Sequence, residues 1–167
     1  WDKHNGDLSV PANARYICES RPDAVIHLAG RRASVAAQHK ESADLLLGNL
    51  AIDVAVLSAA RSLKIPKLVY ASTVSVYPDW TFVGDPGVVR ERTCNYAFKE
   101  EHASAFPSDS VRYSAWGKLT AERMIEAVRV TDGLDWSVVR LVNTFGPHDD
   151  FGPTALVVPS LIRRMLA

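Results

Sequence analysis

Three short apolar runs stand out along the chain, separated by longer segments of mixed character. They read DAVIHLAG at 23–30, KLVYAS at 67–72 and WSVVRL at 136–141. Runs of this length without polar alternation are typical of strands in a parallel sheet that is covered on both faces. We therefore expect 23–29, 67–72 and 136–141 to be neighbouring parallel strands joined by right-handed crossovers.

The segments between these runs have the periodicity of helices. Between residues 42 and 63, apolar residues recur at spacings of three or four, which predicts a helix packed on the sheet through Leu46, Leu50, Val54, Leu57 and Ala60. A second long helix is expected over 114–130, ending near Gly133, and a shorter one over 155–166. A helix-like stretch also precedes the first run and stops at Pro22.

The chain shows little periodicity from Tyr77 to Arg112, where several prolines and glycines occur. Loops of this length in compact domains are usually functional or mobile. We expect 79–111 to be the least ordered interior segment.

This order of elements predicts an α/β fold with a doubly wound parallel sheet, of the Rossmann-like type. Nucleotide-binding folds of this type carry a glycine-rich turn after the first strand, and neither G-x-G-x-x-G nor G-x-x-G-x-x-G occurs in the sequence. The predicted strand at 23–29 would also be left with an unpaired apolar edge. We therefore expect that the N-terminal strands are missing from this chain, which begins at Trp1 and not at a methionine.

Composition and charge narrow the classes of partner. Lysine and arginine together number 19, as do aspartate and glutamate, so no net positive field exists to attract nucleic acid or an anionic membrane. The longest apolar stretch is interrupted by Asn49 and Asp53, and no membrane span is expected. Cys18 and Cys94 lie far apart and near no histidine pair, which fits a reducing, cytoplasmic setting.

Five short motifs occur in order along the chain. They are GDLS at 6–9, RPDAVIHLAG at 21–30, LVYASTVSVYP at 68–78, KLTAE at 118–122 and VVRLVNTFGP at 138–147. Together they resemble the extended short-chain dehydrogenase/reductase family, and within it the nucleotide-sugar epimerases and dehydratases. The resemblance implies that 1–147 is the second half of a dinucleotide-binding domain and that 148–167 begins a substrate-binding region.

The same resemblance implies NAD or NADP as cofactor and a nucleotide-activated sugar as substrate. It places Asp7 and Leu8 beside the adenine, and Gly30 at a strand end over which the dinucleotide lies, where a small residue lets the backbone approach a ligand. It makes Asn49 a brace for the active-site backbone. The residues that it assigns to the cofactor are Asp7, Leu8, Leu28, Ala29, Gly30, Arg32, Asn49, Ser72, Lys118 and Val142.

The resemblance also implies catalytic and substrate-binding residues. Thr73, four residues before Tyr77, matches the family's catalytic serine or threonine, whose hydroxyl holds the reacting substrate oxygen. Asn143 would face the substrate. Lys118 matches the family's lysine, which binds the nicotinamide ribose and stabilises a neighbouring tyrosine as phenolate.

The spacing before Lys118 departs from the family pattern, in which the tyrosine lies four residues earlier. Here Tyr113 is five residues earlier and Ser114 is four. In a regular helix, residues four apart lie about 40° apart around the axis, and residues five apart about 140°. Either Tyr113 reaches the lysine from a relaxed helix start, or the usual general base is lost, since the Ser114 hydroxyl cannot simply replace a phenol.

These observations predict an NAD(P)-dependent epimerase, dehydratase or reductase that acts on a nucleotide-activated sugar by hydride transfer. The alternative is a non-catalytic or regulatory dinucleotide-binding protein of the same fold. A homodimer through the helices at 42–63 and 114–130 is also expected. No metal site is expected, because His148, Asp149 and Asp150 are adjacent on a loop and cannot all face one ion.

Overall fold

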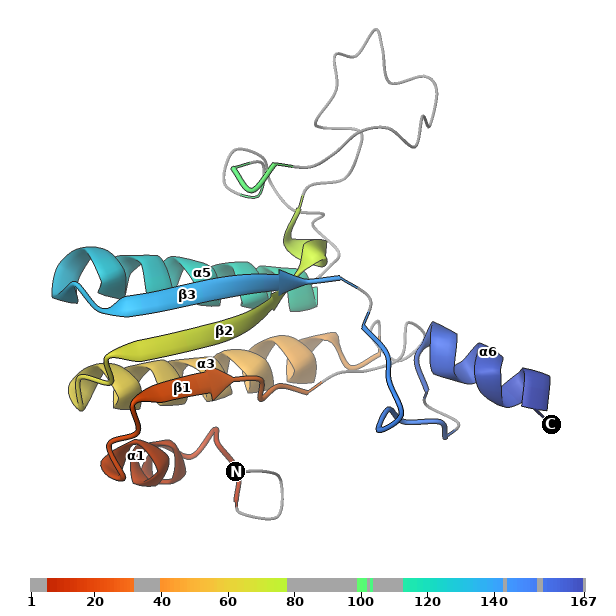
Figure 1. Ribbon diagram of the computed structural model, residues 1–167, viewed down its shortest axis with the longest axis horizontal. Coiled ribbons are helices and arrows are strands. Elements are labelled where there is room, and N and C mark those ends of the chain that lie inside the picture. Colours follow the sequence, from red (N-terminus) through yellow and green to blue (C-terminus); the bar gives the residue numbers. More distant parts are fainter. Residues whose placement is uncertain are drawn as a thin grey trace, which may run out of the picture.

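The computed structural model describes residues 6–31, 40–77, 99–101, 103, 113–142, 144–152 and 155–166 of the chain. Its centre is a three-stranded parallel sheet in the order β1-β2-β3 (Figure 1), formed by β1 (Ala24–His27), β2 (Lys67–Thr73) and β3 (Asp135–Leu141). In the register, His27 lies opposite Tyr70, and Thr73 lies opposite Leu141. The prediction of three neighbouring parallel strands is confirmed. β1 ends earlier than predicted, so Leu28 and Ala29 follow the strand instead of lying in it.

Two long helices lie side by side against one face of this sheet (Figure 1). They are α3 (Ser42–Ser62) and α5 (Tyr113–Asp132), close to the predicted bounds. The short helix α1 (Pro11–Glu19) begins with proline at its first helical position and packs on α3. The 3₁₀ turn η1 (Val74–Val76) follows β2, and α6 (Val157–Leu166) lies away from the sheet near the C-terminus.

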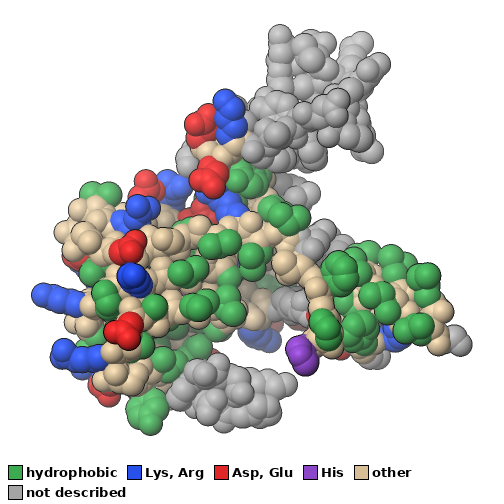
Figure 2. All heavy atoms as spheres, viewed as in Figure 1, with side chains coloured by type: hydrophobic (Ala, Val, Ile, Leu, Met, Phe, Trp, Pro, Cys, Tyr) green, Lys and Arg blue, Asp and Glu red, His purple; other side chains and the backbone are tan. Residues whose placement is uncertain are grey.

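The core lies between the sheet and the helices. Leu68, Tyr70 and Trp136 are fully buried on the helix-covered face, where the indole Nε1 of Trp136 donates to the carbonyl of Ile65 at 3.0 Å. The opposite face differs from the expectation of a sheet covered on both sides. Within the described residues its apolar side chains stay exposed, with Ile26 66% and Val139 45% accessible, and Figure 2 shows hydrophobic side chains across this face.

The predicted core face of α3 is partly wrong. Leu57 and Ala60 are buried, but Val54 is 48% exposed, and the neighbouring Asp53 is buried in its place. The reason is that α3 is apolar almost all round, so that periodicity defines its inner face poorly, while His27 and Tyr70 bind the buried carboxylate.

The apolar character of α3 has one further aspect. Among the described residues, α3 is the helix whose length and composition would also suit a membrane span. Half of its most apolar stretch is buried within the protein. Core helices commonly meet the same criterion.

A left-handed glycine ends α5. Gly133 has φ +68°, and its N–H donates to the carbonyl of Arg129 at 3.1 Å, which closes the last helical turn.

We expect Gly133→Ala to lower the free energy of unfolding by about 1 kcal/mol, because an added Cβ meets nothing within 4 Å and only the backbone conformation is strained. Urea unfolding measures this cost. Gly146→Ala is the matched control, since its added Cβ also meets nothing and its φ is not left-handed. Equal effects of the two substitutions would contradict the conformational argument.

The segment predicted to be least ordered, 79–111, lies outside the described residues except for 99–101 and 103.

Candidate functional site

The carboxyl ends of the strands carry most of the residues that the sequence singled out. In open α/β sheets, ligands bind in the crevice beyond these ends. A groove of about 810 Å³ runs along β1 and the loop after it. It brings together five of the predicted cofactor residues, namely Asp7, Leu8, Leu28, Ala29 and Gly30.

Asp7 shapes the turn that enters this groove. Its carboxylate accepts the backbone N–H of Ser9 at 2.8 Å, and this hydrogen bond lowers the pKa of Asp7 below its usual value. Its carbonyl accepts the side-chain amide of Asn13 at 2.8 Å. Leu8 packs against the core. Asp7 therefore has a local structural role, whatever ligand the groove holds.

Asn49 on α3 holds the loop after β1 by both of its amide atoms. Its Oδ1 accepts the backbone N–H of Arg31 at 2.6 Å, and its Nδ2 donates to the carbonyl of Arg31 at 2.9 Å. The Asn49 side chain thus pairs with both the backbone N–H and the backbone carbonyl of Arg31, as the backbone of a neighbouring strand would. This contact fixes the backbone that carries Gly30.

Lys118 on α5 reaches the same region from below the sheet. Its Nζ donates to the carbonyl of Ala71 at 2.9 Å and lies 4.4 Å from the centre of the Tyr70 ring. Burial lowers the pKa of Lys118, and the charge of Asp53 opposes this by raising it. The structure therefore places one partly buried cation between the ends of β1 and β2.

Thr73 and Ser72 end β2 on opposite faces. The Oγ1 of Thr73 accepts the N–H of Ser75 at 3.2 Å and caps η1. Ser72 is buried, and its hydroxyl donates to Glu122 at 2.5 Å on the helix-covered side. A contact of Ser72 with a cofactor would therefore have to come from its backbone.

Tyr113 and Ser114 occupy the first turn of α5. Tyr113 is the first residue of the helix and is 45% exposed, whereas Ser114 is partly buried. The five-residue gap from Tyr113 to Lys118 therefore lies within the helix, and Ser114 is the residue one turn before the lysine. Among the hydrogen bonds and ion pairs of the described residues, none joins either side chain to Thr73, so the choice between Tyr113 and Ser114 stays a prediction.

The remaining predicted positions add less. Val142 follows β3 and is exposed, while Arg32 and Asn143 lie outside the described residues. Asp149 and Asp150 accept backbone N–H groups of their own loop at 2.8 and 2.7 Å. Within the described part of the chain, no group of three or more histidine, cysteine, aspartate and glutamate side chains is placed to hold a metal ion.

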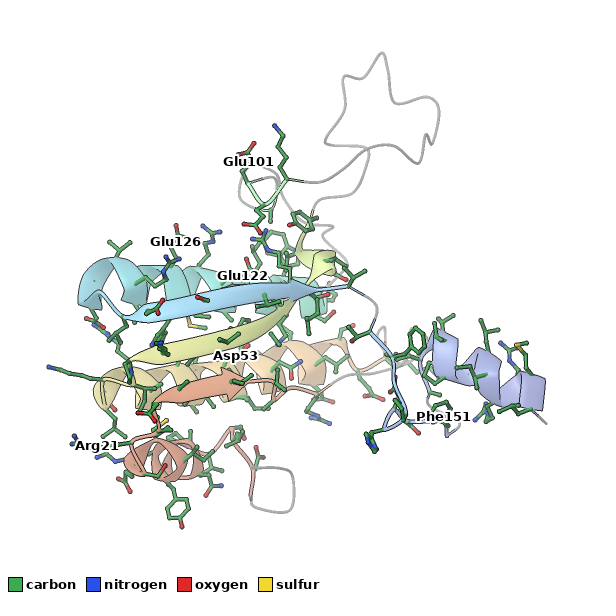
Figure 3. The ribbon with its side chains drawn as sticks, in the orientation of Figure 1. Arg21, Asp53, Glu101, Glu122, Glu126 and Phe151 are labelled. Atoms are coloured by element: carbon green, nitrogen blue, oxygen red, sulfur yellow. The ribbon has the colours of Figure 1, made fainter. Side chains whose placement is uncertain are left out.

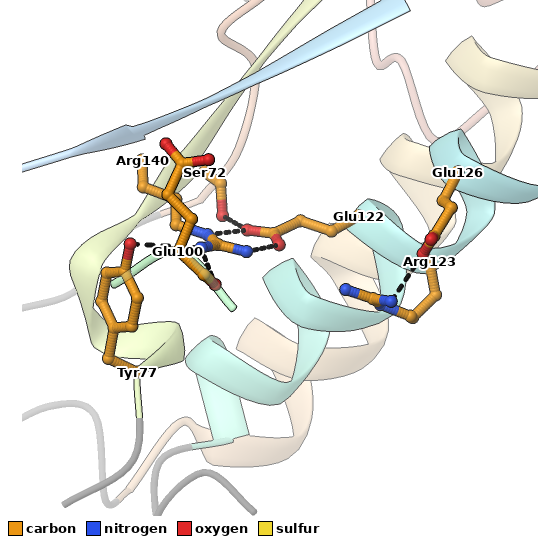
Figure 4. Close-up of polar contacts among 7 residues, drawn as sticks. All are labelled: Ser72, Tyr77, Glu100, Glu122, Arg123, Glu126 and Arg140. Atoms are coloured by element: carbon orange, nitrogen blue, oxygen red, sulfur yellow. Dashed lines mark hydrogen bonds and ion pairs between the residues drawn. The ribbon is translucent and has the colours of Figure 1, made fainter. Parts of the chain in front are cut away.

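A buried ion pair that the sequence analysis missed supports the site from α5 and β3 (Figure 4). Arg140 donates through Nη2 and Nε to the two carboxylate oxygens of Glu122, at 2.7 and 3.1 Å. Its Nη1 donates to the Tyr77 hydroxyl and to the carbonyl of Glu100. This pairing raises the pKa of Arg140, mainly through its hydrogen bond to Glu122. A signal was present: Glu122 follows Lys118 by one turn, and Arg140 interrupts an apolar strand.

A second missed cluster lies under β1 and β2. Asp53 accepts the Tyr70 hydroxyl at 2.8 Å and contacts Nε2 of His27 at 2.9 Å. All three side chains are buried, and Figure 3 labels Asp53 on α3 and Glu122 on α5, the two helices under the sheet. Desolvation and the charge of Asp53 raise the pKa of Tyr70 far above its usual value, so this phenol stays protonated.

One edge of the parallel sheet thus combines the loop after β1, the partly buried ammonium of Lys118 and the hydroxyl of Thr73. A match to a known protein family agrees with this arrangement. The sequence model of the NAD dependent epimerase/dehydratase family matches residues 2–167. The chain belongs to this family.

Curated and solved proteins that resemble this chain carry names that refer to different GDP-sugars. A protein named putative GDP-L-fucose synthase 2 from Oryza sativa subsp. japonica is 30% identical over 161 residues, which are 95% of this chain and 43% of the relative. GDP-L-fucose synthase of Escherichia coli (strain K12) is 25% identical over 150 residues, 89% of this chain and 43% of the relative. A solved structure of a GDP-D-glycero-L-gluco-heptose synthase from Campylobacter jejuni, in the presence of NADPH, is also similar. It matches with a TM-score of 0.80 at 22% identity, and the match covers 98% of this chain and 45% of the synthase chain.

The chain therefore spans less than half the length of these epimerase/dehydratase relatives. The likeness to the solved structure shows the fold, which is Rossmann-like with a parallel sheet. The resemblance expected from the five motifs is confirmed by the family match.

The cofactor of this epimerase/dehydratase family is NAD or NADP. The described residues fit such a group at the end of β1. A Cβ added to Gly30 would lie 3.5 Å from Oδ1 of Asn49 and 3.9 Å from Nζ of Lys118. Both are ordinary contact distances, so the backbone of Gly30 lies directly beside an amide and a cation, which suits a polar ligand that approaches this backbone closely.

Proposed function

We propose that the protein transfers a hydride between NAD(P) and a nucleotide-activated sugar, as an epimerase, dehydratase or reductase. The observation that carries this proposal is the position of Lys118, whose ammonium lies at the carboxyl edge of the sheet beside Gly30. A cation fixed there has the right charge to bind a ribose hydroxyl and to favour a neighbouring anion. Bound NAD(P) supplies the hydride acceptor or donor.

The protein's own residues would bind the substrate, orient it and move its proton. Asn49 keeps the backbone at Arg31 in place, so that the cofactor face stays ordered. The Thr73 hydroxyl accepts a backbone N–H, and within the described part of the chain its own proton makes one long contact, of 3.3 Å, with the Ser75 hydroxyl. That proton is therefore available to a substrate oxygen, where charge develops in the transition state. Tyr113 would transfer the proton while Lys118 lowers the cost of its anionic form.

For the substrate, we propose a GDP-activated sugar. The support is that two curated relatives, at 25% and 30% identity, are named as GDP-L-fucose synthases. We also propose NADP as the cofactor, because the structurally similar heptose synthase was solved with NADPH.

The alternative is a dinucleotide-binding protein that does not catalyse a reaction. The observation that favours it is the Tyr113 to Lys118 spacing, since α5 already begins at Tyr113. Five residues of regular helix direct two side chains to different sides.

A cofactor-turnover assay separates the two functions. With NADP or NADPH and a panel of GDP- and UDP-sugars in their hydroxyl and keto forms, a reductase should change the nicotinamide absorbance with GDP-sugars. An epimerase or a dehydratase returns the hydride to the sugar within each turnover, so it should convert the GDP-sugar, as followed by chromatography, with no net change in absorbance. Lys118→Met is the matched control and should show no change. Cofactor binding by fluorescence titration, with neither an absorbance change nor a converted sugar, would contradict the catalytic proposal and favour the alternative.

We further propose that the protein is a cytoplasmic homodimer joined by the outer faces of α3 and α5. Leu47, Ala51 and Val54 form an exposed apolar stripe on α3 at helical spacing, which supports this interface. A sedimentation mass of one chain at micromolar concentration would contradict it.

We propose the same organisation as the sequence predicted, with 148–167 beginning a substrate-binding region. In support, α6 lies apart from the sheet and exposes Val157, Leu161 and Met165 (Figure 2).

A further inference from the structure

A buried polar cluster, formed by Asp53, His27 and Tyr70, links α3, β1 and β2 to the proposed catalytic lysine. Asp53 on α3 is 1% exposed, and its two carboxylate oxygens contact His27 on β1 and Tyr70 on β2. The rings of His27 and Tyr70 lie 5.4 Å apart. A carboxylate buried this deeply needs such partners, because an unpaired buried charge is costly.

The Tyr70 ring connects this carboxylate to Lys118. The phenol donates to Asp53 at one end, and the ammonium of Lys118 lies over the ring face, 4.4 Å from its centre. A ring face attracts a cation, and a hydroxyl that donates to a carboxylate makes its ring more electron-rich. Asp53 therefore acts on the lysine both directly by charge and through the polarised ring.

The other groups facing Lys118 do not replace Asp53. The ammonium of Lys118 donates to the carbonyl of Ala71 on β2, which carries no charge. The amide of Asn49 on α3 and the ammonium both lie near Gly30, but this amide is neutral as well. Glu122, one turn further along α5, is bound by Arg140 and Ser72. His27 contacts the carboxylate on the side of Oδ1, away from the oxygen that accepts Tyr70.

We propose that Asp53, acting through Tyr70, is the positioning residue of Lys118 and holds its ammonium in the cationic form at the end of β2. Burial disfavours that cation and lowers the pKa of Lys118, and the charge of Asp53 raises it. The importance of this arrangement for catalysis rests on the proposed function. The electrostatic coupling itself does not.

The test is a direct titration of Lys118 in the absence of substrate. Lysines are reductively methylated with ¹³C-formaldehyde, and the Lys118 signal is assigned by its loss in Lys118→Arg. We expect Asp53→Asn to lower the pKa of Lys118 by about one unit, because an opposite charge close by favours the charged form. Asparagine has the shape of aspartate and can still hydrogen-bond to Tyr70 and His27, so this substitution tests charge more than packing.

Two further variants separate the coupling from a merely structural role. Tyr70→Phe keeps the ring and removes its hydrogen bond to Asp53. It should therefore also lower the pKa of Lys118, by a smaller amount than Asp53→Asn. If Asp53→Asn does not fold, this variant provides the test. Asp44→Asn removes an equal charge from an exposed position of the same helix and should leave the Lys118 titration unchanged.

The outcomes distinguish this inference from the proposed function. A Lys118 pKa that is the same in Asp53→Asn and Asp44→Asn would overturn the inference. If the pKa falls and the protein turns over substrate, the high-pH limb of the turnover profile should move to lower pH by the same amount. A fallen pKa with no turnover in the unmodified protein would uphold the inference and contradict the proposed function alone.

Discussion

Replacing Tyr113 with phenylalanine is expected to lower turnover at least about 100-fold while leaving NAD(P) binding intact. This is the usual size of a lost general acid-base group. Tyr113 begins α5 and is half-exposed, so its hydroxyl is open to a substrate at the carboxyl edge of the sheet. Steady-state kinetics with the sugar nucleotide that responds in the cofactor assay, together with fluorescence titration of the cofactor, measure the two quantities.

Ser114→Ala is the matched comparison, because Ser114 lies one turn before Lys118 on the same helix. We expect it to lower turnover less than about tenfold, since a serine hydroxyl is not made anionic by one lysine. The reverse order of effects would assign Ser114 to the site and remove Tyr113 from proton transfer. Full activity of both variants would show that neither group moves the proton.

Arg140→Leu is expected to lower the free energy of unfolding by about 3 kcal/mol, because it leaves the carboxylate of Glu122 buried without its cation. The side chain of Glu122 is 3% exposed, and that of Arg140 is 16% exposed. The Ser72 hydroxyl still donates to Glu122, but one neutral hydrogen bond cannot balance the charge. Urea unfolding followed by circular dichroism measures the loss.

An exposed ion pair on the same helix provides the control. Arg123 and Glu126 on α5 are also in contact (Figure 4). Both side chains are about half-exposed, so Arg123→Leu should change the free energy of unfolding by less than about 1 kcal/mol. The double variant Glu122→Gln with Arg140→Leu should lose less than the sum of the single losses, because no charge is left buried. Equal losses for Arg140→Leu and Arg123→Leu would show that burial of Glu122 contributes nothing.

Local sequence pattern was sufficient for the elements but not for the side chains that join them. The three apolar runs became parallel strands because each is too short for a helix and is followed by an amphipathic or apolar helix. The motifs also singled out Asp7, Leu8, Leu28, Ala29 and Gly30, which line one groove beside β1, while their contact with a cofactor stays a prediction.

The polar groups under the sheet were not predicted, since their partners are distant in sequence. In the sequence, Asp53 merely interrupts an apolar stretch, whereas in the structure this buried acid needs the hydroxyl of Tyr70 and the ring of His27. Glu122 and Arg140 need each other for the same reason. Sequence spacing shows that such residues face inward, and only the three-dimensional arrangement shows what they meet.

The parallel pairing of the strands has a consequence for how fast the chain can fold. No two of these strands form a hairpin, since Lys67 pairs with Asp135 and Ala24 pairs with Lys67 across whole helices. Closing such long loops costs entropy before any ladder hydrogen bond compensates for it. Folding is therefore expected to begin with α3 and α5, whose contacts within each helix are local, and the strands can align only after these helices have docked.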